Sequence, residues 1–184
     1  MRRVIIDNLL SLDGYFAGPD GEIDWFQFDE ESLEWSREIL REVDTVLFGR
    51  VTYEVLASYW PTAAAMAEEP FIARRLTEVR KFVFSKTLPT ASWINSTVVS
   101  DPPVEFVSKL KEEPGAAIVV LGSSTVVSAL VRAGLVDDYK IRVQPMILGK
   151  GRPLFLGQDQ RRALTLVSST PFKSGVVALH YKPA

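Results

Sequence analysis

The sequence contains no cysteine and a single histidine, His180. The lack of cysteine excludes disulfide bonds, thiolate nucleophiles and cysteine-bound metal ions. One histidine does not support a polyhistidine metal site or a Ser-His-Asp triad, and His180 falls in a predicted terminal strand, where a structural histidine is the ordinary case. We therefore expect no metal site.

Strong charge of one sign and long apolar runs are also missing. Lys and Arg total 21 against 23 Asp and Glu, and the net charge of −2 creates no field that would recruit nucleic acid or an anionic membrane. Residues 1–7 have neither a signal peptide nor a membrane anchor. With 184 residues, 47% of them hydrophobic, the sequence predicts one globular domain over residues 1–184. Without cysteine or a signal peptide, the expected location is the reducing cytoplasm.

Apolar runs of strand length alternate with segments of helical periodicity. This alternation predicts a three-layer α/β fold with a mostly parallel central sheet and an antiparallel pair at the C-terminus. Asp29 is expected to cap a helix, and Gly134 to end one. Residues 11–21 are predicted to be a loop, and residues 62–69 are ambiguous. The expected strands are 4–10, 45–48, 82–84, 97–99, 117–121, 139–143, 164–168 and 176–181, and the other expected helices are 51–59, 70–79, 103–110 and one with its apolar stripe at 126–131.

Four loops with suggestive chemistry follow predicted strands, at Gly14, Gly49, Ser85 and Gly122. Ligands of parallel sheets bind outside the carboxyl ends of the strands. We therefore expect these loops to meet at one edge of the sheet.

The segment Gly49-Arg50-Val51-Thr52 joins a glycine turn, a cation and a hydroxyl at a helix start. The first amides of a helix lack intrahelical partners and attract phosphate, and a guanidinium can bind phosphate with two hydrogen bonds. The alternative is a glycine turn with Arg50 in a surface salt bridge.

A second helix start follows a buried strand at Gly122-Ser123-Ser124-Thr125. Glycine lets a pyrophosphate approach the backbone and the hydroxyls can donate to it, although a plain serine N-cap is the alternative. Ser85-Lys86-Thr87, after the third strand, could bind the 2′-phosphate that distinguishes NADP from NAD, or could be an ordinary turn with an exposed lysine.

The candidates for the substrate end are Asp13, Asp24, Trp25 and Glu30. A carboxylate can hydrogen-bond ring nitrogens or assist proton transfer, and Trp25 can stack on a heterocycle. Alternatively, Asp13 suits a turn and Glu30 the first turn of a helix. The segment 145–155, which includes Leu148 and Gly149, either lines the nicotinamide or substrate or is a structural loop.

Taken in order, these segments resemble the dihydrofolate reductase-like superfamily, and most of all the reductase domain of the riboflavin-biosynthesis deaminase-reductase. The zinc-binding deaminase half is absent. The resemblance rests on Ser11-Leu12-Asp13-Gly14, Gly49-Arg50-Val51-Thr52-Tyr53-Glu54, Phe84-Ser85-Lys86-Thr87-Leu88, Leu121-Gly122-Ser123-Ser124, Gly134-Leu135-Val136-Asp137-Asp138 and the run from Pro145 to Phe155.

The resemblance implies NADPH as the cofactor and a homodimer. It implies that the segments 49–52 and 85–87 face the adenosine phosphates and that 122–125 faces the pyrophosphate. The loop 13–18, including Ala17, would lie near nicotinamide and substrate. From the chemistry of the residues themselves, Asp13 or Glu30 could relay a proton, and Asp24 and Trp25 could bind the substrate. The acid that binds pteridine in dihydrofolate reductases has no clear match.

The leading hypothesis is an NADPH-dependent reductase of a small planar heterocyclic or carbonyl substrate, similar to 5-amino-6-(5-phosphoribosylamino)uracil reductase or dihydrofolate reductase. One alternative is an NADP-binding dimer without turnover, acting as a sensor or interaction partner. Another is a purely structural dimer, which predicts no nucleotide binding.

Overall fold

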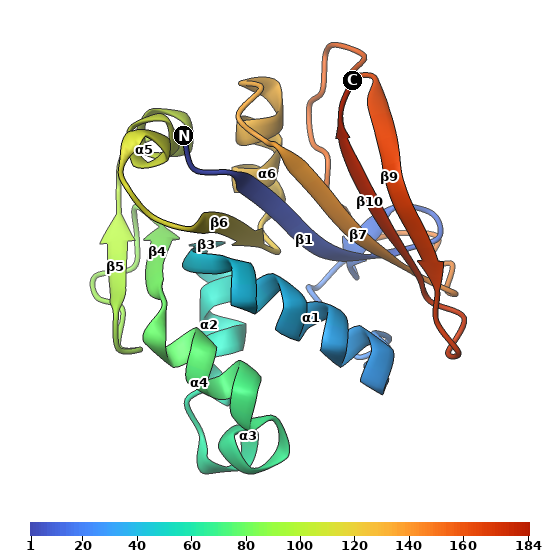
Figure 1. Ribbon diagram of the computed structural model, residues 1–184, viewed down its shortest axis with the longest axis horizontal. Helices are drawn as coiled ribbons and strands as arrows, with labels where there is room; N and C mark the ends of the chain where they lie inside the picture. Colours follow the sequence, from blue (N-terminus) through green and yellow to red (C-terminus); the bar gives the residue numbers. More distant parts are fainter.

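The computed structural model describes all residues 1–184 and contains one eight-stranded sheet in the order β5-β4-β3-β6-β1-β7-β10-β9, with a two-stranded sheet β2-β8 beside it (Figure 1). The strands are β1 Val4–Ser11, β2 Tyr15–Ala17, β3 Val43–Gly49, β4 Arg80–Phe84, β5 Ser96–Val99, β6 Ala117–Leu121, β7 Asp138–Gln144, β8 Arg152–Pro153, β9 Leu164–Pro171 and β10 Val177–Pro183. The helices are α1 Glu30–Glu42, α2 Arg50–Tyr59, α3 Ala63–Glu68, α4 Pro70–Glu78, α5 Pro103–Glu112 and α6 Ser124–Arg132.

Six strands, from β5 to β7 in the sheet order, run parallel, and β10 is antiparallel to both β7 and β9. The predicted fold class is therefore confirmed. The apolar runs form the central strands because both faces of a parallel sheet are covered by helices.

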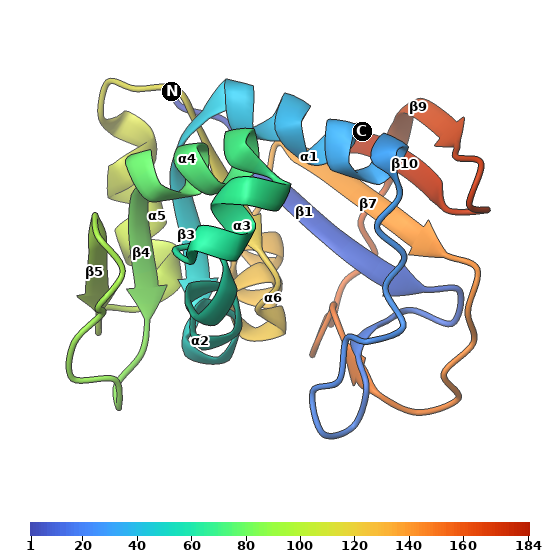
Figure 2. The ribbon, with the colours of Figure 1, turned by 90° about the horizontal axis from the view of Figure 1, so that it is seen from below.

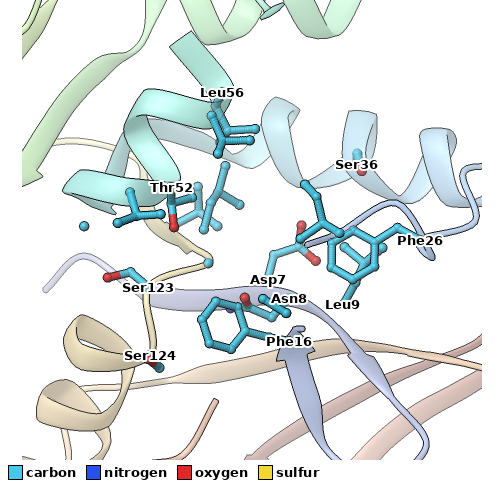
Figure 3. A pocket seen from close by; sticks show the side chains of 18 of the residues that line it. Asp7, Asn8, Leu9, Phe16, Phe26, Ser36, Thr52, Leu56, Ser123 and Ser124 are labelled. Atoms are coloured by element: carbon cyan, nitrogen blue, oxygen red, sulfur yellow. The ribbon is translucent and has the colours of Figure 1, made fainter. Parts of the chain in front are cut away.

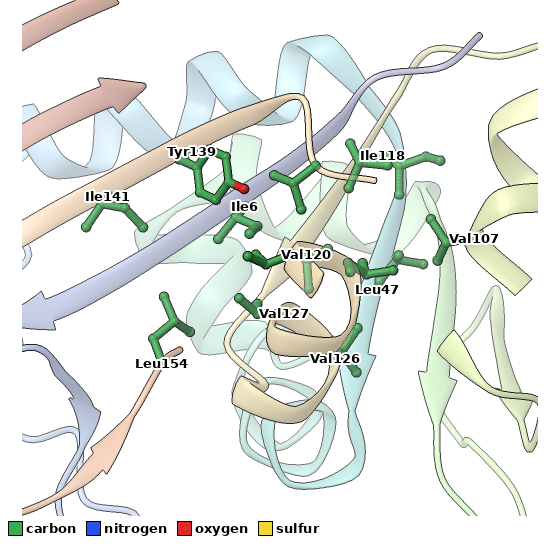
Figure 4. Close-up of a cluster of buried hydrophobic side chains, with 14 of the residues drawn as sticks. Ile6, Leu47, Val107, Ile118, Val120, Val126, Val127, Tyr139, Ile141 and Leu154 are labelled. Carbon is green, nitrogen blue, oxygen red and sulfur yellow. The ribbon is translucent and has the colours of Figure 1, made fainter. Parts of the chain in front are cut away.

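Side chains of the central strand alternate between two cores. Ile5 belongs to the cluster that packs against α1 and α4, whereas Ile6 belongs to the cluster that packs against α5 and α6. Figure 4 shows this second cluster, which joins Val126 and Val127 of α6 with Ile6 of β1 and Val120 of β6. Figure 2 shows the two helical layers on opposite sides of the sheet. The apolar stripes predicted from the sequence are thus what fixes each helix to its face.

Helix boundaries follow the predicted signals. Asp29 caps α1 by accepting the Ser32 amide at 2.7 Å, and Gly134 follows α6 with a φ of +68°. Thr62 caps α3 by accepting the Ala65 amide, so the ambiguous segment 62–69 contains a short helix. The loop predicted over 11–21 contains the short strand β2, which pairs with β8. Two-residue pairings between distant segments leave no periodicity in the sequence, which is why this strand was missed.

The ladders beside β1 have different lengths, and the difference creates the space for a site. β1 pairs with β6 only from Val4 to Asp7, but with β7 from Ile5 to Ser11. Beyond Asp7, β1 therefore has a neighbour on one side only. The sheet opens there, at its carboxyl edge.

Candidate functional site

A cavity of about 570 Å³ lies at this opening (Figure 3). Its size is typical of small-molecule and cofactor sites. Residues at or beyond the carboxyl ends of β1, β3, β4 and β6 line it, including Ala17, Gly49, Ser85 and Gly122, whereas the predicted Gly14 lies outside the lining. The four loops thus meet at one edge, as the parallel topology predicts.

Two helices begin at this cavity without a side-chain cap. Gly49 and Ser123 stand at the N-cap positions of α2 and α6, and neither helix start receives a capping side-chain hydrogen bond. Elsewhere α1 and α3 are capped by side chains, and α4 and α5 begin with proline, which has no amide hydrogen to satisfy. The amides that open α2 and α6 therefore remain available to an anion.

Ser123 does not act as the plain N-cap considered from the sequence. Its φ is +56°, next to Gly122 at +58°, and its hydroxyl forms no hydrogen bond with the helix start, although the residue lines the cavity. A left-handed non-glycine residue is strained and has to be held by its surroundings. Thr52 provides part of that environment, because a β-carbon on Gly122 would lie 2.6 Å from its Oγ1.

The cavity also holds a buried ion pair that the sequence prediction missed. Asp7 on β1 accepts a hydrogen bond from Arg142 on β7 at 3.0 Å between Oδ2 and Nη2, and both side chains are almost fully buried. Arg142 also donates to Ser32 and Ser36 of α1. Burial raises the pKa of Asp7, while the Arg142 guanidinium acts in the opposite direction. The Trp35 indole, whose Nε1 is buried without another partner, also lowers the pKa of Asp7 through a side-chain hydrogen bond.

Most of the residues predicted to bind a cofactor line this one cavity. Arg50 lines the cavity and also forms an exposed ion pair with Glu54 at 3.0 Å, so the salt bridge is observed and the phosphate contact stays a prediction. A surface pair of this kind is weak and does not prevent a phosphate contact. The predicted cofactor residues among the lining are Ala17, Gly49, Arg50, Thr52, Ser85, Gly122, Ser123, Ser124 and Thr125.

The turn after β4 is held by its own serine. Ser85 Oγ accepts the amides of Thr87 and Leu88 at 3.1 and 2.9 Å. Ser85 lines the cavity, while Lys86 and Thr87 are exposed beside it and are not part of the lining. Lys86 forms no salt bridge, so its charge is free to meet an anion at the rim.

Asp13 connects two loops and does not line the cavity. Its carboxylate oxygens accept the amides of Leu148 and Gly149 at 3.1 and 2.8 Å. The Ser11 hydroxyl and these amides lower the pKa of Asp13. Leu148 and Gly149 also lie outside the lining, and with their amides engaged they are not donors for a cofactor.

The remaining substrate candidates also lie outside the lining. Glu30 is exposed and pairs with Arg37, and Asp24 is exposed without a hydrogen bond. Trp25 donates to the Glu22 carbonyl and packs edge-on against Phe26. It is the neighbouring apolar side chains, Ile23, Phe26 and Phe28, that line the cavity. The substrate roles of Asp13, Asp24, Trp25 and Glu30 stay predictions.

Sequence reasoning overlooked Asp7, Asn8 and Arg142. A signal was present, because Asp7 and Asn8 interrupt the apolar run of β1 and Arg142 lies between Ile141 and Val143 of β7. Asn8 lines the cavity as well, and its Nδ2 is buried without a partner. No group of three or more His, Asp or Glu residues could hold a metal ion, and no helix is both long and apolar enough to cross a bilayer.

Comparison with known proteins decides the family. The sequence profile of the RibD C-terminal domain matches residues 2–178. The chain belongs to the RibD C-terminal domain family. This RibD C-terminal domain is similar in sequence to the uncharacterized protein YyaP of Bacillus subtilis strain 168. The two are 33% identical over 181 residues, which are 98% of this chain and 94% of YyaP.

Solved structures of other proteins have the same fold as this RibD C-terminal domain. A deaminase/5-amino-6-(5-phosphoribosylamino)uracil reductase from Thermotoga maritima superposes with a TM-score of 0.69 at 19% identity, over 100% of this chain and 57% of that one. Dihydrofolate reductase from Enterococcus faecalis, solved with NADP(H) and RAB-propyl, superposes with a TM-score of 0.68 at 15% identity, over 98% and 96% of the two chains. The family match confirms the expected riboflavin reductase-domain branch, and the solved structures show the dihydrofolate reductase-like fold.

Proposed function

We propose that this protein is an NADPH-dependent reductase of a small planar, nitrogen-containing or carbonyl substrate. The observation that carries the proposal is the pair of uncapped helix starts, at Gly49 and Ser123, opening into one cavity. Two anion sites on one sheet edge suit a cofactor with several phosphate groups. Membership of a reductase-domain family and the NADP(H) in the Enterococcus faecalis relative support the same conclusion.

The residues present fit such a cofactor. The α6 start and the hydroxyls of Ser123, Ser124 and Thr125 would hold the pyrophosphate. The α2 start with Arg50 would hold the adenosine phosphates, and Lys86 the 2′-phosphate. When bound, NADPH supplies a hydride, and the protein's part is to orient the two reactants and exclude water.

The test is a titration of the protein with NADPH and with NADH, followed by tryptophan fluorescence. Trp60 lines the cavity and provides a reporter inside it. We expect saturable binding with NADPH bound more tightly, and oxidation of bound NADPH when a reducible heterocycle is added. Firm binding without oxidation of NADPH by any substrate would favour a sensor role. No binding of either nucleotide would refute the proposal.

A further inference from the structure

Asn8 carries a buried amide group that the rest of the protein does not satisfy. It is the first residue of β1 beyond the ladder with β6, which ends at the pair Asp7 and Leu121. The side chain lines the cavity, only 3% of the residue is exposed, and Nδ2 has no hydrogen-bond partner. A buried donor without an acceptor is costly, and a ligand that accepts a hydrogen bond removes that cost. Asn8 therefore offers an unused donor to whatever occupies the cavity.

The Asn8 side chain points to the α6 side of the sheet, away from Asp7. Side chains of a strand alternate between its faces, and Ile6 and Leu10, two positions before and after Asn8, both belong to the core on the α6 side. In Figure 3 Asn8 lies on the side of β1 where the Phe16 ring is. Phe16 packs against the same core and also lines the cavity. A flat ring entering here would meet an aromatic side chain and a free amide group together.

The order of the strands places Asn8 beyond the proposed phosphate contacts. The strands β4, β3, β6 and β1 are consecutive neighbours in the sheet. The proposed contacts follow this order, with the 2′-phosphate after β4, the α2 start after β3 and the pyrophosphate at the α6 start after β6. The adenosine half of the cofactor thus extends from β6 toward β4. Its nicotinamide half would extend the other way, over β1, and so reach Asn8.

Nicotinamide carries a group that matches an asparagine side chain. Its primary carboxamide has a carbonyl oxygen that accepts a hydrogen bond and an NH2 group that donates, and Asn8 offers the same two groups. Two such amides can pair, and the pairing satisfies the buried Nδ2 without bringing a charge into the cavity. The ring itself would lie beside Phe16, where two aromatic rings can pack.

We propose that Asn8 binds the nicotinamide carboxamide, donating from Nδ2 to its carbonyl oxygen, and so fixes the rotation of the ring in the cavity. Fixed orientation matters because hydride transfer needs the two reacting carbons aligned. The inference rests on the proposed function and adds to it a residue that reads the ring, whereas Arg50 and Lys86 would hold phosphates.

The first experiment needs no variant. Calorimetry measures the binding of three ligands to the native protein: NADPH, its thionicotinamide analogue and 2′-phospho-ADP-ribose, which has no ring. We expect NADPH to bind about 10-fold or more tightly than 2′-phospho-ADP-ribose. The thionicotinamide analogue keeps the ring but replaces the carbonyl oxygen by sulfur, a weak acceptor, and should bind several-fold more weakly than NADPH.

The second experiment replaces the amide by an apolar group of similar size. Asn8→Leu should weaken NADPH about 10-fold, leave 2′-phospho-ADP-ribose unchanged and abolish the difference between NADPH and its thionicotinamide analogue. The unliganded variant should be at least as stable as the native protein in urea, because a buried amide without a partner is lost. Ser96→Ala is the control, because Ser96 Oγ on β5 is also buried without a partner but lies outside the cavity. It should leave all three affinities unchanged.

The outcomes separate this inference from the proposed function. If neither NADPH nor 2′-phospho-ADP-ribose binds the native protein, the proposed function falls and the inference with it. If both bind but Asn8→Leu keeps the native affinity for NADPH, or loses affinity for both ligands equally, the role of Asn8 alone is overturned. If Asn8→Leu does not fold, the native protein decides, because equal affinities for NADPH and its thionicotinamide analogue would overturn the same role.

Discussion

Gly49 and Ser123 begin two different helices and touch so closely that no β-carbon fits between them. A β-carbon on Gly49 would lie 2.3 Å from Ser123 Oγ and 3.2 Å from Ser123 Cβ. The φ of Gly49 is −85°, which any residue adopts, so the requirement for glycine is purely steric. The two helix starts are thereby held at a fixed spacing.

Replacing Gly49 with alanine should push these helix starts apart. We expect Gly49→Ala to lower stability by about 1–3 kcal/mol, as overpacking does, and to weaken NADPH binding. The Gly49→Ala, Ser123→Ala double variant removes the clashing oxygen and should recover much of the stability. Urea unfolding of the four proteins in a double-mutant cycle measures the coupling, and additive losses would contradict the close contact.

Arg50 should contribute to cofactor binding far more than to folding. Arg50→Ala should weaken NADPH binding about 10-fold and change the stability of the unliganded protein by less than about 1 kcal/mol. Glu54→Ala removes the same ion pair but keeps the cation, and should not weaken NADPH binding. A large loss of stability in Arg50→Ala would instead show a structural role.

Lys86 should decide between the two nucleotides. A charge-assisted contact to the 2′-phosphate predicts that NADPH binds more tightly than NADH by about 1–3 kcal/mol. Lys86→Ala should remove most of this preference and leave NADH affinity unchanged. Lys173→Ala, an exposed lysine away from the cavity, is the control for net charge. Equal affinities in the native protein would exclude this role for Lys86.

Asp13 should hold the loop that contains Leu148 and Gly149. Its pKa lies below the ordinary 3.8, so the carboxylate is ionised and accepts both amides throughout the neutral range, and this contribution is lost only as the pH falls below that value. Asp13→Ala should accelerate hydrogen exchange at those two amides. Asp24→Ala, at an exposed carboxylate without hydrogen bonds, should not. Unchanged protection in Asp13→Ala would show that the loop is held by other contacts.

Lys81 should make stability depend on pH in the alkaline range. Its ammonium is fully buried and donates to the carbonyls of Leu76 and Val79, and burial lowers its pKa from 10.5 to about 8. Between those values the unfolded chain binds more protons, so stability rises with pH. Relative to Lys81→Met, the native protein should gain about 1–2 kcal/mol between pH 8 and pH 10. Urea unfolding at both pH values measures the gain, and parallel profiles would refute it.

The elements of the fold were predictable where the signal was local. Apolar runs such as 117–121, the Asp29 cap and the glycine after α6 lie within a few residues of the feature they specify. The strand β2 could not be predicted from the sequence, because its partner β8 lies more than 130 residues away and the pairing involves only two residues of each strand.

The candidate site was predictable in part for the same reason. A helix start is a local feature, so the segments 49–52 and 122–125 were found, and they line one cavity. The importance of Asp7 depends on Arg142, 135 positions away, and is invisible until β1 and β7 lie side by side. Conversely, the sequence suggested Asp13 as a proton relay, but in the structure its carboxylate accepts hydrogen bonds from backbone amides of a distant loop.

The unequal ladders on the two sides of β1 also have a mechanical consequence. The half of the molecule that carries α2 and α6 is joined to β1 by the four residue pairs from Val4 to Asp7, while the half that carries β7, β10 and β9 is joined along seven. Fewer residue pairs therefore resist separation of the strands at the β1–β6 seam than at the β1–β7 seam, and the space beyond Asp7 lies where the shorter seam stops.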